Sequence, residues 1–159
     1  MSLSILAERV GAALVASGHK LVTAESCTGG WVAQCITSVA GSSAWFERGF
    51  VTYSNLSKQE LLGVPQETLK QWGAVSEETV REMAMGALRH SAAQCALAVT
   101  GIAGPAGGTP AKPVGTVWFA WQRIGEVCLT RRERFEGDRR AVRRQAVRVA
   151  LLGMLNVYR

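Results

Sequence analysis

Two small nucleophilic side chains, Ser26 and Cys27, lie side by side in a short polar segment, residues 23–30 (Thr-Ala-Glu-Ser-Cys-Thr-Gly-Gly). A strand-like run precedes this segment, and an apolar, helix-like run begins at Trp31. A turn between a strand and a helix exposes side chains at the strand's end and leaves the first N–H groups of the helix without partners. A nucleophile beside such donors suits attack on a carbonyl, because the donors stabilise the oxyanion that forms. The plainer alternative is a Gly-rich turn whose serine or threonine only caps the helix.

Tyr53 and Lys58 are the candidate acid–base partners of Ser26. If Tyr53 ends a strand and Lys58 lies in the first turn of the next helix, both side chains reach the same edge of the sheet. A lysine kept neutral by burial or by nearby positive charge can accept the serine proton, and a tyrosine hydroxyl can relay it. The only histidines, His19 in a turn and His90 at a helix end, do not suggest a Ser-His-Asp triad. The plainer alternatives are an exposed lysine and a half-buried strand tyrosine.

A loop rich in glycine and proline, residues 101–113, follows an apolar strand-like run that ends at Thr100. Glycines such as Gly101 and Gly104 let the backbone approach a ligand closely, and consecutive N–H groups can bind an anion. The loop has neither the P-loop nor the Rossmann pattern. Because it follows an apolar strand, a site-forming role is at least as well supported as that of a flexible surface loop, and both interpretations stay open.

Length and composition indicate a single soluble globular domain. The chain has 159 residues and 48% hydrophobic residues, enough for a real core. No apolar run reaches the roughly 20 residues that span a bilayer. The N-terminus lacks the pattern of a signal peptide, so we expect a cytoplasmic protein without a membrane partner.

The four cysteines have no C-x-x-C spacing, and with so few histidines a zinc site is not expected. In a reducing cytosol, Cys35, Cys95 and Cys128 are interpreted as small buried residues. Cys27 differs because it lies in the polar turn.

The net charge of +6 comes largely from arginines near the C-terminus. They are Arg131, Arg132, Arg134, Arg139, Arg140, Arg143, Arg144 and Arg148. A solvated helix face is the first interpretation, a phosphate clamp for a small ligand the second, and a nucleic-acid surface the third. We do not expect nucleic acid, because no aromatic residues alternate with these arginines to stack on bases.

Apolar periodicity predicts alternating helices and strands, then a hairpin. Helices are expected over residues 3–17 (stopped by Gly18), 31–39, 77–89 (capped by Ser76) and after Asp138, with strands over residues 20–24, 48–53, 95–100, 116–121 and 126–135. A short helix capped by Asn55 or Ser57 should end at Gly63, and another should run from Pro65 toward Trp72. This order predicts a layered α/β domain with a mixed sheet.

Two helices have predicted core faces. In residues 31–39 the expected face carries Trp31, Cys35 and Val39. The final helix is expected to bury Val142, Ala146, Val149 and Leu152.

Five motifs together carry a family resemblance. They are residues 23–30, 41–55, 73–76, 100–105 and 112–117. In this order and at these intervals the chain resembles the CinA C-terminal family over almost its whole length, and more narrowly the stand-alone nicotinamide-nucleotide amidases of that family. Some relatives carry an additional N-terminal domain, and we expect residues 1–159 to form the amidase domain alone.

The resemblance implies an α/β/α sandwich without a required metal or cofactor. It implies hydrolysis of the amide of nicotinamide mononucleotide to nicotinate mononucleotide and ammonia. By motif position the nucleophile is Ser26, assisted by Lys58 and Tyr53.

On this hypothesis the other candidates bind substrate. Backbone N–H groups near Thr28, Gly29 and Gly30 hold the oxyanion. The loop residues Thr100, Gly101 and Gly104, with Arg139 or Arg143, bind the phosphate; spacing alone does not choose between the arginines.

Two other function classes stay open. One is a cysteine hydrolase using Cys27, which lacks an evident histidine base. The other is a non-enzymatic module that binds nucleotides or nucleic acid through the arginine-rich region. A homodimer is a further expectation, because Trp45 and Phe46, taken as exposed, would suit an interface.

Overall fold

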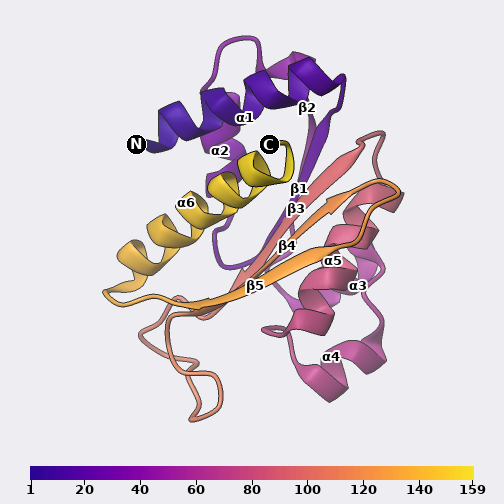
Figure 1. Ribbon diagram of the computed structural model, residues 1–159. Coiled ribbons are helices and arrows are strands. Elements are labelled where there is room, and N and C mark those ends of the chain that lie inside the picture. The colour runs from indigo at the N-terminus through magenta and orange to yellow at the C-terminus, as the bar shows by residue number, and fades with distance from the viewer.

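The centre of the molecule is a five-stranded sheet in the order β2-β1-β3-β4-β5. The computed structural model describes all residues 1–159 (Figure 1). The strands are β1 (Leu21–Glu25), β2 (Phe46–Val51), β3 (Cys95–Gly101), β4 (Thr116–Arg123) and β5 (Leu129–Arg134). β1 pairs in parallel with β2 and β3, whereas β4 is antiparallel to both β3 and β5. The sheet is therefore mixed, and the carboxyl ends of β1, β2 and β3 meet at one edge.

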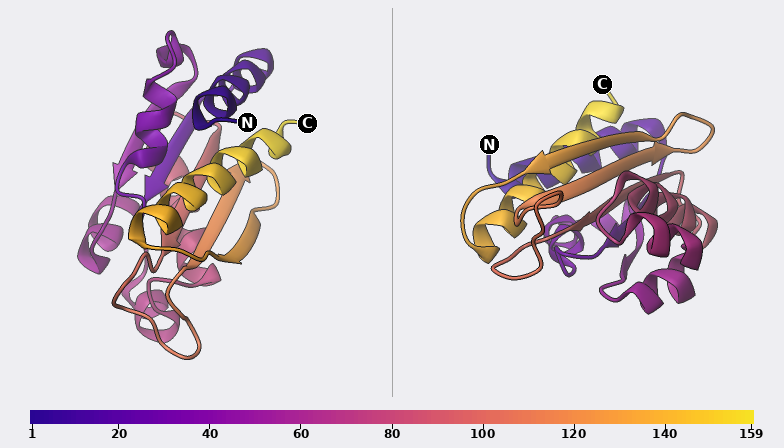
Figure 2. Two further views of the ribbon diagram at one scale, coloured as in Figure 1. Left: turned by 90° about the vertical axis from the view of Figure 1, so that its left-hand side faces the viewer. Right: turned by 90° about the horizontal axis from the view of Figure 1, so that it is seen from below.

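Helices cover both faces of this sheet. One layer holds α1 (Leu3–Ser17), α2 (Trp31–Thr37) and α6 (Arg139–Val157). The other holds α3 (Asn55–Leu62), α4 (Gln66–Trp72) and α5 (Glu77–Arg89). Figures 1 and 2 show the two layers on opposite sides of the strands. The expected three-layer α/β/α architecture is confirmed. No helix combines the length and apolar character needed to cross a bilayer.

Alternation along β3 divides the core between the two faces. Leu97 and Val99 belong to the cluster under α1 and α6, whereas Ala96 and Ala98 belong to the cluster under α5. Successive strand side chains point to opposite faces, so the alanines present a flat surface to α5. This lets α5 lie close to the sheet.

Helix ends follow local capping chemistry. Gly18 ends α1 in the left-handed conformation with φ 70°, and the Ser76 hydroxyl caps α5, both as predicted. The cap of α3 is Ser54, so the prediction of Asn55 or Ser57 was wrong. Ser54 and Ser57 form a reciprocal capping box, in which each hydroxyl accepts a hydrogen bond from the other residue's N–H.

The buried faces of two helices differ from prediction. α2 buries Val32 and Ile36, while Trp31, Cys35 and Val39 are only half-buried. The rotation follows from the start of α2, where the Glu25 carboxylate binds backbone N–H groups and fixes the helix orientation.

In α6, Val142 and Ala146 are buried as expected, Val149 is half-buried, and Leu152 is 37% exposed. Leu151 and Met154 take the core positions instead. The expected face advances by three residues after Ala146, whereas buried positions of α6 also recur every four residues, at 142, 146, 150 and 154, so the two faces diverge along the helix.

Trp45 is not a surface aromatic. Its side chain is 3% exposed, because the missing side chain of Gly11 on α1 leaves room for the indole ring. Phe46 is half-buried. The expectation that these two residues are exposed was wrong, and they give no support to a dimer interface.

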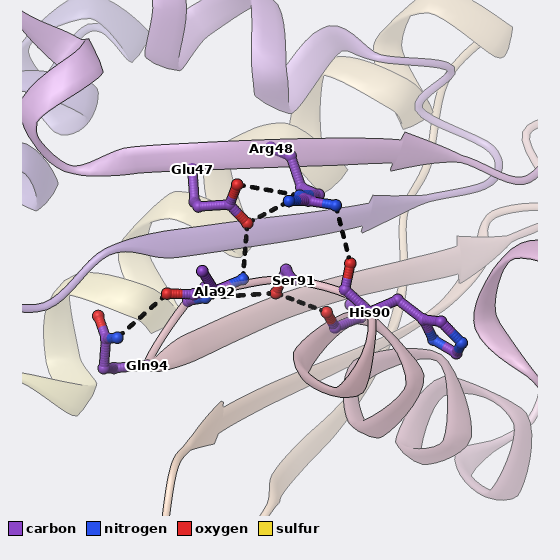
Figure 3. Close-up of polar contacts among 8 residues, drawn as sticks. Glu47, Arg48, His90, Ser91, Ala92 and Gln94 are labelled. Carbon is purple, nitrogen blue, oxygen red and sulfur yellow. Dashed lines mark hydrogen bonds and ion pairs between the residues drawn. The ribbon is translucent and has the colours of Figure 1, made fainter.

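A polar cluster ties the edge strand β2 to the connection between α5 and β3 (Figure 3). The Glu47 carboxylate accepts hydrogen bonds from Arg48 Nε at 2.8 Å and from the Ala92 N–H at 2.9 Å. Arg48 Nη1 donates to the His90 carbonyl at 3.0 Å. These contacts hold β2, and with it the start of α3, against the rest of the sheet.

Candidate active site

Ser26 directly follows β1 at the edge where the parallel strands end. Its N–H donates to the Val99 carbonyl at 3.0 Å, which continues the sheet pairing by one residue. Its carbonyl accepts from the Gly29 N–H at 3.0 Å, which closes the turn before α2. The strand–turn–helix arrangement inferred from the sequence is present, and it fixes the Ser26 backbone on both sides.

Glu25 holds the same turn from within β1. Its buried carboxylate accepts hydrogen bonds from the Thr28 hydroxyl at 2.6 Å, the Val32 N–H at 2.9 Å and the Ala33 N–H at 3.1 Å. A carboxylate at the first turn of a helix also interacts favourably with the helix dipole. This role was not predicted from the sequence, although a glutamate followed three residues later by threonine and then by a helix was a signal for it.

Arg143 of α6 holds the turn from the other side. Its Nε donates to the Cys27 carbonyl and its Nη2 to the Thr28 carbonyl, each at 3.1 Å. The guanidinium also lies 5.5 Å from the centre of the Trp31 ring. Two of the three guanidinium nitrogens are thus engaged with the turn, and a role of Arg143 in binding the phosphate stays a prediction.

Lys58 reaches Ser26 from the first turn of α3. Its Nζ lies 3.0 Å from Ser26 Oγ and also donates to the carbonyls of Thr52 at 2.8 Å and Tyr53 at 3.3 Å. The residue is 1% exposed, and burial lowers its pKa from 10.5 to about 8, slightly opposed by the nearby Cys27. A neutral amine is therefore accessible near neutral pH, next to a hydroxyl.

Tyr53 lies at the mouth of the site rather than on Ser26. Its side chain is 62% exposed, and its hydroxyl accepts a hydrogen bond from Arg139 Nη2 at 2.9 Å. Arg139 Nη1 donates to the Gly104 carbonyl at 2.7 Å. The pair therefore links the segment after β2 to the glycine-rich loop across the site.

These groups surround a cavity of about 210 Å³. It is lined by Ser26, Cys27, Tyr53, Lys58, Ala74, Val75, Thr100, Gly101, Ala103 and Arg139. Of the candidates from sequence, the structure leaves Thr28, Gly29, Gly30, Gly104 and Arg143 out of this lining. Ala74, Val75 and Ala103 were missed as lining residues; their only signals were the motif at residues 73–76 for the first two and the motif at residues 100–105 for Ala103.

The backbone donors expected to hold an oxyanion are partly engaged. The Gly29 N–H donates to Ser26, whereas the N–H groups of Thr28 and Gly30 donate to no backbone carbonyl. The N–H of Cys27 also donates to no backbone carbonyl, and Cys27, next to Ser26, does line the cavity.

Cys27 is a poor candidate nucleophile. Burial, with a smaller contribution from Glu25, raises the pKa of its thiol to about 12. A Cβ at Gly101 would lie only 3.1 Å from its Sγ, so the thiol is packed against β3. Neither histidine serves as a base for this thiol: His19 binds Tyr158, and His90 binds the Gly86 carbonyl.

The arginine-rich region is partly used within the chain. Besides Arg139 and Arg143, Arg131 pairs with Glu133 and Arg148 donates to the Met1 carbonyl.

No group of three or more His, Cys, Asp or Glu side chains is placed to hold a metal ion. The expectation of metal-free chemistry stays a prediction that a chelator can test.

Comparison with known proteins places this site in a family. The profile of the CinA C-terminal domain matches residues 3–158. The chain belongs to the CinA C-terminal domain family. It is 62% identical to "Nicotinamide-nucleotide amidohydrolase PncC" of Escherichia coli K12 over 92% of this chain and 88% of that protein. It is 54% identical to the protein of the same name from Pseudomonas putida, over 98% of this chain and 96% of that one.

Solved structures agree with this assignment. A CinA superfamily protein from Klebsiella pneumoniae 700603 superposes with a TM-score of 0.95 at 44% identity, covering 99% of this chain and 98% of that one. The competence/damage inducible protein CihA from Agrobacterium tumefaciens gives 0.93 at 46% identity, covering 98% and 99%. The fold is therefore that of the CinA superfamily.

Proposed function

We propose that this protein hydrolyses the carboxamide of nicotinamide mononucleotide, giving nicotinate mononucleotide and ammonia. The names of its close CinA-family relatives support an amidohydrolase acting on a nicotinamide nucleotide. The observation that carries the mechanism is the 3.0 Å contact between Ser26 Oγ and the buried Lys58 amine. A hydroxyl becomes a competent nucleophile when a base within hydrogen-bond reach accepts its proton.

In the first half of the proposed reaction, neutral Lys58 takes the Ser26 proton while Oγ attacks the carboxamide carbon. The N–H of Cys27, next to Ser26 in the cavity, is the candidate donor to the oxyanion. When the tetrahedral intermediate collapses, the C–N bond breaks and Lys58 returns the proton to the departing nitrogen. Ammonia leaves, and Ser26 carries the nicotinoyl group as an ester.

In the second half, water replaces ammonia. Lys58 accepts a proton from water as the oxygen attacks the ester carbon. Collapse breaks the bond to Oγ, Lys58 reprotonates Ser26, and nicotinate mononucleotide is released. Tyr53, at the cavity mouth, is proposed to assist proton transfer and to close over the ring. The cationic pyridinium of the substrate withdraws electrons from the carbonyl and favours both attacks.

Ammonia release tests the proposal. The wild-type protein should convert nicotinamide mononucleotide to nicotinate mononucleotide and ammonia, with or without a chelator. Ser26→Ala should lose more than about 1,000-fold in kcat, since the covalent route is removed. Cys27→Ala is the matched control one residue away and should retain most activity.

The opposite pattern, with loss in Cys27→Ala and retention in Ser26→Ala, would assign the chemistry to the thiol. Activity lost to the chelator and restored by a divalent metal would overturn the metal-free route. Far-UV circular dichroism on each variant separates these outcomes from unfolding.

A further inference from the structure

A second cavity, of about 190 Å³, adjoins the catalytic one. Its lining consists of Trp72, Val75, Ser76, Glu77, Glu78, Ala111, Lys112, Thr116, Trp118 and Arg132. Val75 lines both cavities, so the two are adjacent at this residue. The second cavity lies between the start of α5, the last part of the glycine-rich loop and the strands β4 and β5.

The sheet register connects the two cavities in a straight row. Thr100 of β3 is paired with Trp118 of β4, and Trp118 is paired with Arg132 of β5. Paired residues of antiparallel strands place their side chains on the same face. At roughly 4.8 Å per strand, the Arg132 backbone lies about 10 Å from that of Thr100. The row therefore runs from the catalytic cavity over an indole ring to a guanidinium.

The charged groups of this row differ in how far they are engaged. The Arg132 guanidinium makes no hydrogen bond or ion pair within the chain, although its backbone belongs to the sheet. Lys112 is anchored by one hydrogen bond from Nζ to the Trp72 carbonyl at 2.6 Å, which leaves two N–H donors. The Glu77 carboxylate binds Thr130 and Arg81, whereas Glu78 has no such partner. One unengaged guanidinium, one partly engaged ammonium and one unengaged carboxylate thus line the second cavity.

Volume indicates that a nucleotide extends beyond the catalytic cavity. At about 210 Å³ that cavity is smaller than the roughly 300 Å³ at which small-molecule sites begin. Arg139 and Arg143 each already bind two acceptors of the chain, which leaves Arg132 as the unengaged arginine beside a cavity.

We propose that the second cavity binds the ribose phosphate part of the substrate. Lys112 and Arg132 bind the phosphate, since charge-assisted hydrogen bonds from such groups suit its oxygens. Trp118 packs under the ribose, and Glu78 accepts hydrogen bonds from ribose hydroxyls. This inference rests on the proposed function, because it takes a nicotinamide nucleotide as the substrate whose carboxamide meets Ser26.

The test compares nicotinamide mononucleotide with nicotinamide riboside, which lacks the phosphate. In Arg132→Gln and Lys112→Gln, KM for the mononucleotide should rise at least ~10-fold with little change in kcat, because a charge-assisted contact is lost. kcat/KM for the riboside should change less than twofold. Arg131→Gln, the same substitution one residue along β5 on its other face, should leave both substrates unaffected.

Unchanged KM for the mononucleotide in both variants would overturn the subsite while leaving the amidase intact. The proposed function fails separately, if the wild-type protein releases no ammonia. In that case calorimetry with Ser26→Ala still decides the subsite: Arg132-dependent binding of the mononucleotide supports it, and absence of binding, or binding unaffected by Arg132→Gln, refutes it.

Discussion

Lys58 is buried without an acidic partner, which is rare for lysine. Lysines are almost never fully buried unless paired, yet no carboxylate forms an ion pair with this one. Its hydrogen bonds go to two carbonyls and a hydroxyl. Burial without a counter-charge disfavours the ammonium form, and this is the physical origin of the lowered pKa.

The lowered pKa predicts how stability depends on pH. Between the folded pKa of about 8 and the ordinary value of 10.5, the unfolded chain binds more protons at this site than the folded chain. The contribution of Lys58 to the free energy of unfolding therefore rises with pH through this window. From pH 7 to pH 9 the wild type should gain about 1 kcal/mol relative to Lys58→Met, measured by urea unfolding.

The comparison with Lys58→Met is needed because other groups titrate in the same range. Burial also raises the pKa of Cys27 and of Cys95, and these thiols lower stability above about pH 9 in both proteins. Parallel pH curves for the wild type and Lys58→Met would contradict a depressed Lys58 pKa.

Sequence reasoning could bring Ser26 and Lys58 together because both follow parallel strands, whose carboxyl ends share one edge. It could not assign Glu25, because two of the three donors to its carboxylate are backbone N–H groups of α2. It also could not show that Arg143 faces carbonyls rather than a phosphate, since that depends on where α6 crosses the turn.

At the level of elements, the turn that carries Ser26 is fixed by a helix from the far end of the chain. α6 contributes Arg143, whose guanidinium binds consecutive carbonyls of the turn, while Glu25 binds its donors. The positive guanidinium thus holds carbonyl acceptors of this segment, and the negative carboxylate holds its donors. Catalysis depends on such positioning, because small displacements of reacting groups reduce the rate strongly.

Replacing Arg143 should therefore affect turnover more than binding. We expect Arg143→Gln to lower kcat by roughly 10- to 100-fold, with KM for nicotinamide mononucleotide changed less than about twofold. Steady-state kinetics on purified protein measure both. Arg144→Gln is the matched control, because Arg144 is the exposed neighbour on α6. A raised KM with normal kcat would instead place Arg143 on the phosphate.

Element existence was predictable from the sequence, and element detail was not. Each expected helix and strand is present, because caps, glycines and apolar periods are local signals. The rotation of α2 depends on a contact from Glu25, and the cap of α3 depends on which of several neighbouring polar residues enters the capping box. Tertiary contacts and backbone geometry therefore determine the buried face of α2 and the capping residue of α3.

At the level of the whole molecule, two glycines let the helical layers approach their neighbours. A side chain at Gly86 of α5 would collide with the Leu62 carbonyl of α3, and one at Gly153 of α6 would collide with the Trp121 indole of β4. Leu62 lies one helical turn after Lys58 on α3. The spacing between α3 and α5 therefore also sets the position of the candidate base.

Gly86→Ala and Gly153→Ala should separate stability from activity. Overpacking should reduce the free energy of unfolding of each by about 1–3 kcal/mol. Only Gly86→Ala should also lower kcat at a temperature well below its Tm, because it displaces α3. Gly153 is the control: it lies in the last part of α6, roughly 20 Å along the helix from Arg139. Equal kcat in the two variants would contradict this coupling.

The layered architecture follows from alternating strands and helices, and it was predictable. The burial of Trp45 was not, because it depends on Gly11 lying opposite it in another element. Nor could all the residues that line the cavity be predicted from the sequence, since Ala74 and Val75 have apolar side chains without reactive groups.

When the ammonium of Lys58 gives up a proton, the two remaining N–H bonds are enough for the carbonyls of Thr52 and Tyr53. The nitrogen lone pair is then left facing Ser26 Oγ, 3.0 Å away. The hydroxyl can reverse its role from acceptor to donor without any movement of the lysine chain. The two carbonyls thus determine which of the three positions on the nitrogen becomes basic.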